Sequence, residues 1–145
     1  MIGLLQRVAQ ASVEVGAERV ASIGPGLLVL VGVRPDDSEA SAVRLLDRLL
    51  HYRIFADETG RMNLSLSQTL GDLLLVPQFT LAADTHKGLR PGFSTAAPPE
   101  QGRQLFDFLA QTARTRRDRV ETGVFGAHMR VSLINDGPVT FWLES

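Results

Sequence analysis

The 145-residue sequence has no cysteine. This absence excludes a disulfide scaffold, a thiolate nucleophile and a cysteine-bound metal, and it fits a reducing compartment. Histidine is scarce as well, and His51, His86 and His128 lack the i, i+4 spacing of a helical zinc site. We therefore expect no bound metal.

Long hydrophobic runs are also missing. Residues 27–33 form an apolar run of strand length, whereas a helix that crosses a bilayer needs about 20 apolar residues. Residues 1–7 lack the basic and apolar regions of a signal peptide. We expect a cytoplasmic protein that does not enter a membrane.

The sequence carries no strong excess of charge, since its net charge is −1. A nucleic-acid partner would therefore have to bind a local basic patch. Two patches are candidates: the arginine cluster Arg114, Arg116, Arg117 and Arg119, and the pair Lys87 and Arg90. Each could equally be solvated surface, and cations near a helix C-terminus also suit the helix dipole.

Several common catalytic motifs are absent. There is no glycine-rich phosphate loop ending in Lys-Ser or Lys-Thr, no dinucleotide fingerprint and no Gly-x-Ser-x-Gly elbow. We expect no cofactor.

Many short strand-like segments and two helical patterns fill the chain. Residues 27–33 and 73–76 are continuous apolar runs, as in strands covered on both faces. Residues 45–50 place four leucines at helical spacing, after a possible capping box of Asp36 and Glu39. Residues 98–100, Pro-Pro-Glu, favour the start of a second helix that ends near residues 121–123. We predict a single α+β domain over residues 1–145, with a mostly antiparallel or mixed β-sheet and two main helices.

Polar residues follow the apolar run at 73–76. Pro77, Gln78, Phe79 and Thr80 are unusual for pure packing, because a proline removes an amide donor beside two polar side chains. The next segment, residues 82–98, is long for a loop, and long ordered loops tend to be functional.

A second unusual segment is Asn-Asp-Gly-Pro-Val-Thr at residues 135–140, between apolar runs at 129–134 and 141–143. Gly137 can adopt backbone angles closed to other residues, and the bond before Pro138 can be cis. The ordinary interpretation is a hairpin turn, which these residue types favour. The final apolar strand needs a partner, either in the sheet or at a dimer interface.

The two segments offer backbone groups rather than ionisable side chains. Backbone amides can stabilise the oxyanion that develops in acyl transfer, and Thr80 can donate or accept a hydrogen bond. The nucleophile would then be water or a hydroxyl of the substrate itself.

Residues 77–81 and 135–140 resemble the two signature motifs of the D-aminoacyl-tRNA deacylases. Residues 87–93, Lys-Gly-Leu-Arg-Pro-Gly-Phe, are similar to the family's basic loop, and residues 6–8, 11–13 and 52–55 also match. The resemblance extends along essentially the whole chain.

The resemblance implies an α+β homodimer with active sites at the subunit interface. Its reaction is hydrolysis of the ester between tRNA and a D-amino acid, or glycine mischarged on tRNA(Ala). The implied partners are tRNA and a second copy of the chain, not DNA or a membrane.

The resemblance also implies roles for individual residues. Gly137 and Pro138 would form a cis element that enters the partner's site, where backbone carbonyls bind the α-amino group and leave no room for an L side chain. Asn135 would belong to the same substrate-binding segment.

Amides near Gln78 and Phe79 would stabilise the oxyanion. Thr80 would have a positioning role, while the terminal 2′-hydroxyl of the tRNA assists the reaction. The remaining implied roles are support of the Gly-Pro element by Arg7, contact with the terminal adenosine by Phe125 and Met129, and RNA binding by Lys87 and Arg90.

One position departs from the family pattern: residue 77 is proline, where serine is usual. Pro77 removes a hydroxyl and an amide, so rate or substrate preference could differ from the typical member. Two other functions stay open, namely a non-catalytic homodimeric RNA- or nucleotide-binding module that uses the basic patches, and a structural dimer with a degenerate site.

Overall fold

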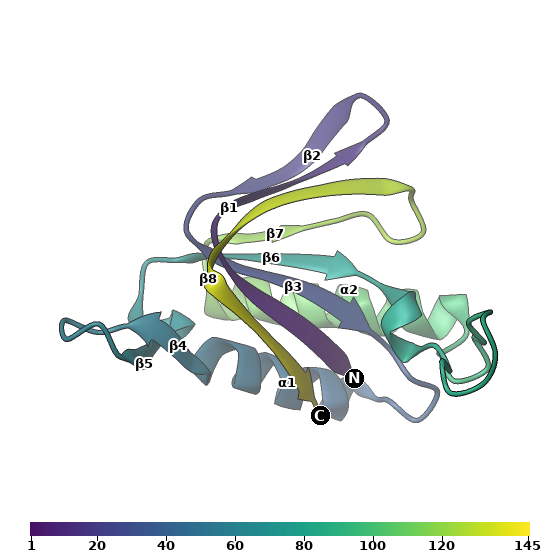
Figure 1. Ribbon diagram of the computed structural model, residues 1–145. Helices are drawn as coiled ribbons and strands as arrows, with labels where there is room; N and C mark the ends of the chain where they lie inside the picture. Colours follow the sequence, from purple (N-terminus) through teal and green to yellow (C-terminus); the bar gives the residue numbers. More distant parts are fainter.

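The computed structural model describes residues 1–145 as a mixed β-sheet with two α-helices packed on one face (Figure 1). In chain order the elements are β1 (Ile2–Val15), β2 (Glu18–Ile23), β3 (Gly26–Gly32), α1 (Glu39–His51), β4 (Arg53–Ala56), β5 (Met62–Ser65), the 3-10 turn η1 (Leu66–Gln68), β6 (Asp72–Pro77), the 3-10 turn η2 (Phe79–Ala82), α2 (Pro99–Arg116), β7 (Val120–Thr122) and β8 (Met129–Glu144). The predicted α+β class is confirmed.

Strand β1 is the centre of the sheet. Its first half pairs with β3 and its second half with β2, while β8 runs antiparallel along its other edge. Strands β3, β6 and β7 continue the sheet in parallel, so the sheet is mixed. β4 and β5 form a separate two-stranded ribbon.

Strands β3 and β6 are covered on both faces, as their continuous apolar runs predict. Leu27, Val29 and Val31 belong to the larger core, which α1 and α2 complete. Leu28 faces the opposite side and joins Val13, together with other residues of β1, β2 and β6, in a second cluster. The sheet is therefore the middle layer between two cores.

The sequence patterns predicted some of the helix ends correctly and others incorrectly. Helix α1 is capped by Ser38 with Ser41, and the expected capping box of Asp36 and Glu39 does not form. Helix α2 begins at Pro99 as predicted, but it ends at Arg116, because residues 120–122 pair with β6 instead. No helix is both long and apolar enough to cross a membrane.

Residues 135–140 are not a hairpin turn, and that prediction is wrong. They lie inside β8, whose two halves both pair with β1. In that register Val8 is opposite Asn135 and Gln6 is opposite Thr140, so residues 136–139 form a bulge in one long strand. In a hairpin the two halves of β8 would pair with each other. Here both halves pair with β1 instead, and the extra residues between them form the bulge.

Candidate active site

The first motif lies where β6 ends. The amide of Gln78 donates to the Val31 carbonyl at 2.7 Å, which extends the pairing with β3 by one residue. The family resemblance implied that amides near Gln78 and Phe79 face the substrate, but the Gln78 amide is used inside the sheet. Phe79 and Thr80 then open η2, and the first amides of such a turn have no partner within it. The Gln78 side-chain amide donates to the Thr80 hydroxyl, so the motif's two polar side chains are in contact.

An exposed aromatic pair extends the first motif towards the following loop. The rings of Phe79 and Phe93 have centroids 5.1 Å apart, and the side chains are 56% and 45% exposed. Lys87 and Arg90 are exposed in the same loop and form no ion pair. A ligand bound at the first motif could therefore contact both aromatic rings and basic side chains.

Backbone contacts hold the loop at both ends. Asp84 and Gly92 exchange backbone hydrogen bonds of 2.8 and 2.9 Å, and the Ala97 amide donates to the Val33 carbonyl at 2.9 Å. Hydrogen bonds from the His86 amide and then from its ring lower the pKa of Asp84. The loop is thus anchored to the end of β3.

The connection between β7 and β8 lies against the same end of the sheet. A Cβ atom added to Gly123 would be 2.9 Å from the Met129 sulfur and 3.3 Å from Pro77 Cδ, so Met129 and Pro77 both lie close to this glycine. The Val124 amide donates to the Met129 sulfur at 3.3 Å. Met129 therefore lies beside the first motif, and Phe125 follows Gly123 by two residues.

The second motif is an exposed bulge fixed by side chains on either side. The Gly137–Pro138 bond is cis, and both residues are exposed. The Asn135 side chain bridges the bulge, because its oxygen accepts from the Val139 amide at 2.6 Å and its nitrogen donates to the Val139 carbonyl at 3.2 Å. The bulge is therefore closed by one amide side chain.

Arg7 supports the bulge from below. Its Nε donates to the Asp136 carbonyl at 2.9 Å, and one terminal nitrogen donates to the Ile54 carbonyl at 2.6 Å. The guanidinium thereby links the bulge to β4, and its side chain is only 15% exposed. The family resemblance implied that Arg7 supports this element, and these contacts are of the kind such a role requires.

The two motifs lie at different ends of the sheet within one chain. Arg7, below the second motif, is paired with Leu27, whereas Gln78 is bonded to Val31. Four residues of strand separate these positions, or about 13 Å along β3, in addition to the lateral distance between strands. Figure 1 shows the bend of β8 on one side and η2 with its loop on the other. One chain does not bring Gln78, Phe79 and Thr80 to Gly137 and Pro138.

The arginine cluster at the end of α2 is mostly used within the protein. Three members have internal partners: Arg116 pairs with Asp47, Arg119 with Asp72 at 3.4 Å, and Arg117 donates to the carbonyls of Leu66 and Gly71. Burial lowers the pKa of Arg117. Arg114 has no carboxylate partner, and it donates to the Thr122 hydroxyl at 3.3 Å.

Sequence reasoning did not single out Arg103. Its guanidinium lies over the Phe125 ring, 5.0 Å from the centroid, and donates to the Phe125 carbonyl at 3.3 Å. Arg103 precedes Arg114 by three helical turns, so both lie on one side of α2. That spacing is the signal that could have identified it.

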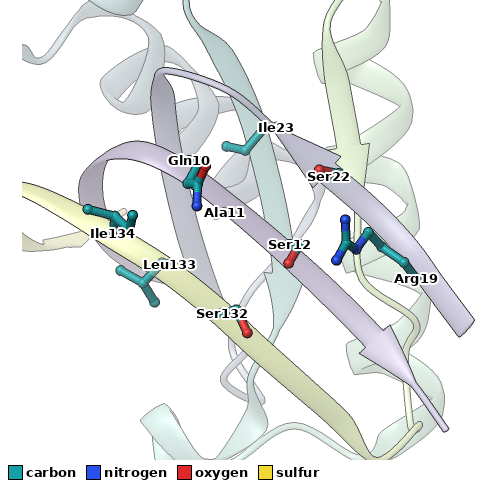
Figure 2. Close-up of a pocket in the computed structure, with 9 residues that line it drawn as sticks. All are labelled: Gln10, Ala11, Ser12, Arg19, Ser22, Ile23, Ser132, Leu133 and Ile134. Carbon is teal, nitrogen blue, oxygen red and sulfur yellow. The ribbon is translucent and has the colours of Figure 1, made fainter. Parts of the chain in front are cut away.

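A separate hollow of about 240 Å³ lies between β1, β2 and β8. Figure 2 shows polar groups of Gln10, Ser12, Arg19 and Ser132 around it, with Ile134 at one end. Neither motif lines it, so we do not take it as the reaction centre. No three His, Asp or Glu side chains come together in the chain as a metal site would need.

Comparison with known proteins places the chain in a family. The family model for D-Tyr-tRNA(Tyr) deacylase matches residues 4–144. A D-aminoacyl-tRNA deacylase from Thioalkalivibrio sulfidiphilus is 64% identical over 144 residues, covering 99% of this chain and 97% of the relative. One from Azotobacter vinelandii is 63% identical over the full length of both chains. The protein therefore belongs to the D-Tyr-tRNA(Tyr) deacylase family, as the two motifs indicate.

Solved structures agree with the fold. The c-Myc DNA Unwinding Element Binding Protein is 37% identical, with a TM-score of 0.95 over 100% of this chain and 99% of that one. A probable eukaryotic D-amino acid tRNA deacylase has a TM-score of 0.89 at 19% identity, over 99% of this chain and 98% of that one, which shows a shared fold alone.

Proposed function

We propose that this protein is a D-aminoacyl-tRNA deacylase, a single domain over residues 1–145 that acts in the cytoplasm. It hydrolyses the ester between a D-amino acid and the 3′ end of tRNA, and also glycyl-tRNA mischarged on tRNA(Ala). The family membership and the names of relatives about 60% identical support this reaction. The observation that carries the site is the exposed Gly137–Pro138 pair, which Asn135 and Arg7 hold in place although neither residue of the pair belongs to the core.

The active enzyme is a homodimer in which Gly137 and Pro138 of one subunit complete the site of the other. The separation of the two motifs within one chain supports this arrangement, because a composite site then needs a second copy. Strand β8 supports it as well, since it pairs only with β1 and leaves its other edge unpaired. Ile134 and Trp142 on this strand are 53% and 47% exposed, so an apolar surface is available to a partner.

Discrimination between D- and L-amino acids comes from backbone rather than from side chains. Carbonyls of the Gly137–Pro138 bulge bind the α-amino group, and the bulge occupies the space that an L side chain would need. Exclusion by fixed backbone works for any side chain, whereas a pocket shaped to one side chain would select among amino acids. A rigid bulge therefore suits an enzyme that must act on D-amino acids of every kind.

The oxyanion is stabilised by the amides of Phe79 and Thr80, because the Gln78 amide is bonded to Val31. Water attacks the ester carbonyl, its proton passes to the departing 3′ oxygen, and the products are free tRNA and the amino acid. The neighbouring 2′-hydroxyl of the tRNA assists this proton transfer. Thr80, in contact with the Gln78 side chain, orients the reacting groups and is not the nucleophile.

The terminal adenosine lies near Phe125 and Met129. Gly123 lies close to both Met129 and Pro77, so this surface adjoins the first motif. Lys87 and Arg90, exposed in the loop that carries Phe93, contact the RNA backbone. Pro77 adds no hydroxyl to the site, so the reaction relies on the amides that follow it.

Comparison of D-Tyr-tRNA with L-Tyr-tRNA as substrates tests the reaction. We expect hydrolysis of the D ester and little of the L ester. Tight binding of tRNA without release of tyrosine at catalytic enzyme concentrations would favour the non-catalytic RNA-binding module instead.

A subunit-mixing experiment tests the shared site. Phe79→Pro removes one amide donor and suits the first position of η2, and Phe79→Ala is the control that keeps the amide. Gly137→Ala impairs the second motif. When Phe79→Pro and Gly137→Ala subunits are mixed equally and allowed to exchange, about one quarter of all sites become intact if the site crosses the interface. No recovery of activity after exchange would place both motifs in one subunit's site.

A further inference from the structure

A groove separates α2 from β7 and the residues that follow it. Its volume is about 270 Å³. The apolar side chains of Phe106, Ala110, Val124 and Phe125 line it, and Val124 is 42% exposed although it is apolar. We call this hollow the α2 groove. Exposed apolar surface between a helix and a loop is available for stacking or for apolar contact with a ligand.

Two arginines border the α2 groove without a carboxylate partner. Arg114 donates only to the Thr122 hydroxyl, and Arg103 stacks on Phe125 and donates to its carbonyl. Asp107 also lines the groove, so its lining has a net charge of one positive unit. Guanidinium groups that no carboxylate neutralises, beside an aromatic ring, are suited to binding phosphates and bases together.

The α2 groove adjoins the candidate active site. Phe125 lines one end of it, and Val124, which also lines it, donates its amide to the Met129 sulfur. Met129 in turn lies beside Gly123 and Pro77 at the end of β6. A ligand that extends from the first motif past Met129 would therefore enter the α2 groove directly.

The spacing of the two arginines fits a short single strand. Arg103 and Arg114 are separated by 11 positions in α2, which corresponds to about 16 Å along the helix axis. That distance is long enough for a short run of unpaired nucleotides. An ester on the last nucleotide of tRNA forces the preceding nucleotides to leave the site along the protein surface.

We propose that the α2 groove binds the unpaired nucleotides that precede the terminal adenosine of the tRNA. Arg103 and Arg114 contact their phosphates, and a base packs against Val124 and Phe125. Contacts of this kind do not read base identity, so they serve tRNAs of every amino acid. This inference rests on the proposed deacylase function, because it assumes that the ester-bearing end lies at the first motif.

The test compares two charge-matched double variants. Arg103→Gln/Arg114→Gln removes both groove cations, whereas Arg44→Gln/Arg61→Gln removes two exposed arginines elsewhere that form no ion pair. On D-Tyr-tRNA we expect the groove variant to raise KM about tenfold and to reduce the salt dependence of KM, with little change in kcat. The control variant should behave as wild type.

A short substrate separates the groove from the reaction centre. D-tyrosyl-adenosine carries the ester but no preceding nucleotide, so the loss on tRNA should exceed the loss on this ester by about tenfold. Equal losses on both substrates would mean that Arg103 acts through Phe125, and equal KM values for groove and control variants would mean that the groove binds no RNA. Either result overturns the inference.

The single variant Arg114→Gln provides a check that leaves Phe125 untouched. It should give a smaller increase in KM in the same direction, and an unchanged KM would also count against the groove. If the wild-type protein hydrolyses neither D-Tyr-tRNA nor D-tyrosyl-adenosine, the proposed function itself fails. That outcome is distinct, because the results for the groove depend on a wild-type protein that is active.

Discussion

Replacement of Gly137 by alanine perturbs the second motif at one atom. The added Cβ would be 2.5 Å from Val139 Cγ2 and 2.6 Å from the Val139 backbone nitrogen. Val139 cannot move away easily, because its side chain is 5% exposed in the core and its amide donates to Asn135 at 2.6 Å. The exposed side of the bulge, Gly137 and Pro138, must therefore move instead.

The size of that movement sets the expected loss of activity. Ordinary contact begins near 3.4 Å, so relief of the 2.6 Å contact requires a shift of 3.4 − 2.6, or about 0.8 Å. A displacement of about 1 Å in a positioning group can cost on the order of 100-fold in rate, equivalent to about 2.7 kcal/mol of activation free energy. We expect kcat/KM for D-Tyr-tRNA to fall by about that factor.

Stability should change less than activity, because the altered residue is exposed. A loss of about 1–2 kcal/mol is expected, and a thermal melt would show a folded variant with a lower Tm. Gly16→Ala is the control: Gly16 has a φ of 60° with no atom near the added Cβ, so alanine costs about 1 kcal/mol there without touching either motif.

The assay measures release of tyrosine from D- and L-Tyr-tRNA by wild type, Gly137→Ala and Gly16→Ala. Wild-type activity and selectivity in Gly137→Ala would refute the assignment of chiral selection to this bulge. Similar losses in Gly137→Ala and Gly16→Ala would attribute the effect to stability alone.

Three further changes test other parts of the structure. Thr80→Ala should lower kcat without abolishing turnover, because the hydroxyl positions groups and is not the nucleophile; complete loss of chemistry with tRNA binding intact would contradict this. Asn135→Ala removes the hydrogen bonds across the bulge and should lower both kcat/KM and stability, the latter by about 1–3 kcal/mol, and an unchanged melting curve would be the opposing result. Hydrogen bonds from Arg34 and then Trp142 lower the pKa of Glu144 from 4.5 to about 2. The Glu144 carboxylate therefore stabilises the fold above pH 4.5, and this contribution is lost as the pH falls from 4.5 towards 2. The urea midpoints of wild type and Glu144→Gln should therefore converge as the pH falls over that range. The change should be small, because the Arg34–Glu144 ion pair is half exposed. A difference in midpoint that stays constant with pH would show that this ion pair does not form.

The strands and helices of the core follow from local patterns. Residues 27–33 and 73–76 are apolar at every position, so a strand there must be buried on both faces, and β3 and β6 are. The leucines of α1 repeat at helical spacing, and Pro99 can occupy the first turn of α2 because that position needs no amide donor.

The candidate site depends on hydrogen bonds between strands, which local sequence patterns do not predict. Which amides remain free after β6 could not be read from the sequence, because the Gln78 amide is used by Val31, a residue 47 positions earlier. The arginine cluster likewise looked uniform, yet Arg116 and Arg117 are held by α1 and by the loop before β6. Only the tertiary structure shows that Arg114 and Arg103 line the same groove.

The sequence by itself determined the α+β class, the two motifs and their family, because residue identity and short-range spacing suffice for these. Only the tertiary structure decided that Asn135 to Thr140 is a bulge within one strand, and that the two motifs lie about 13 Å or more apart in one chain. The physical reason is that β-strands hydrogen-bond to partners far away in sequence. Their register, and hence the place of each backbone group, is set by the whole sheet rather than by neighbouring residues.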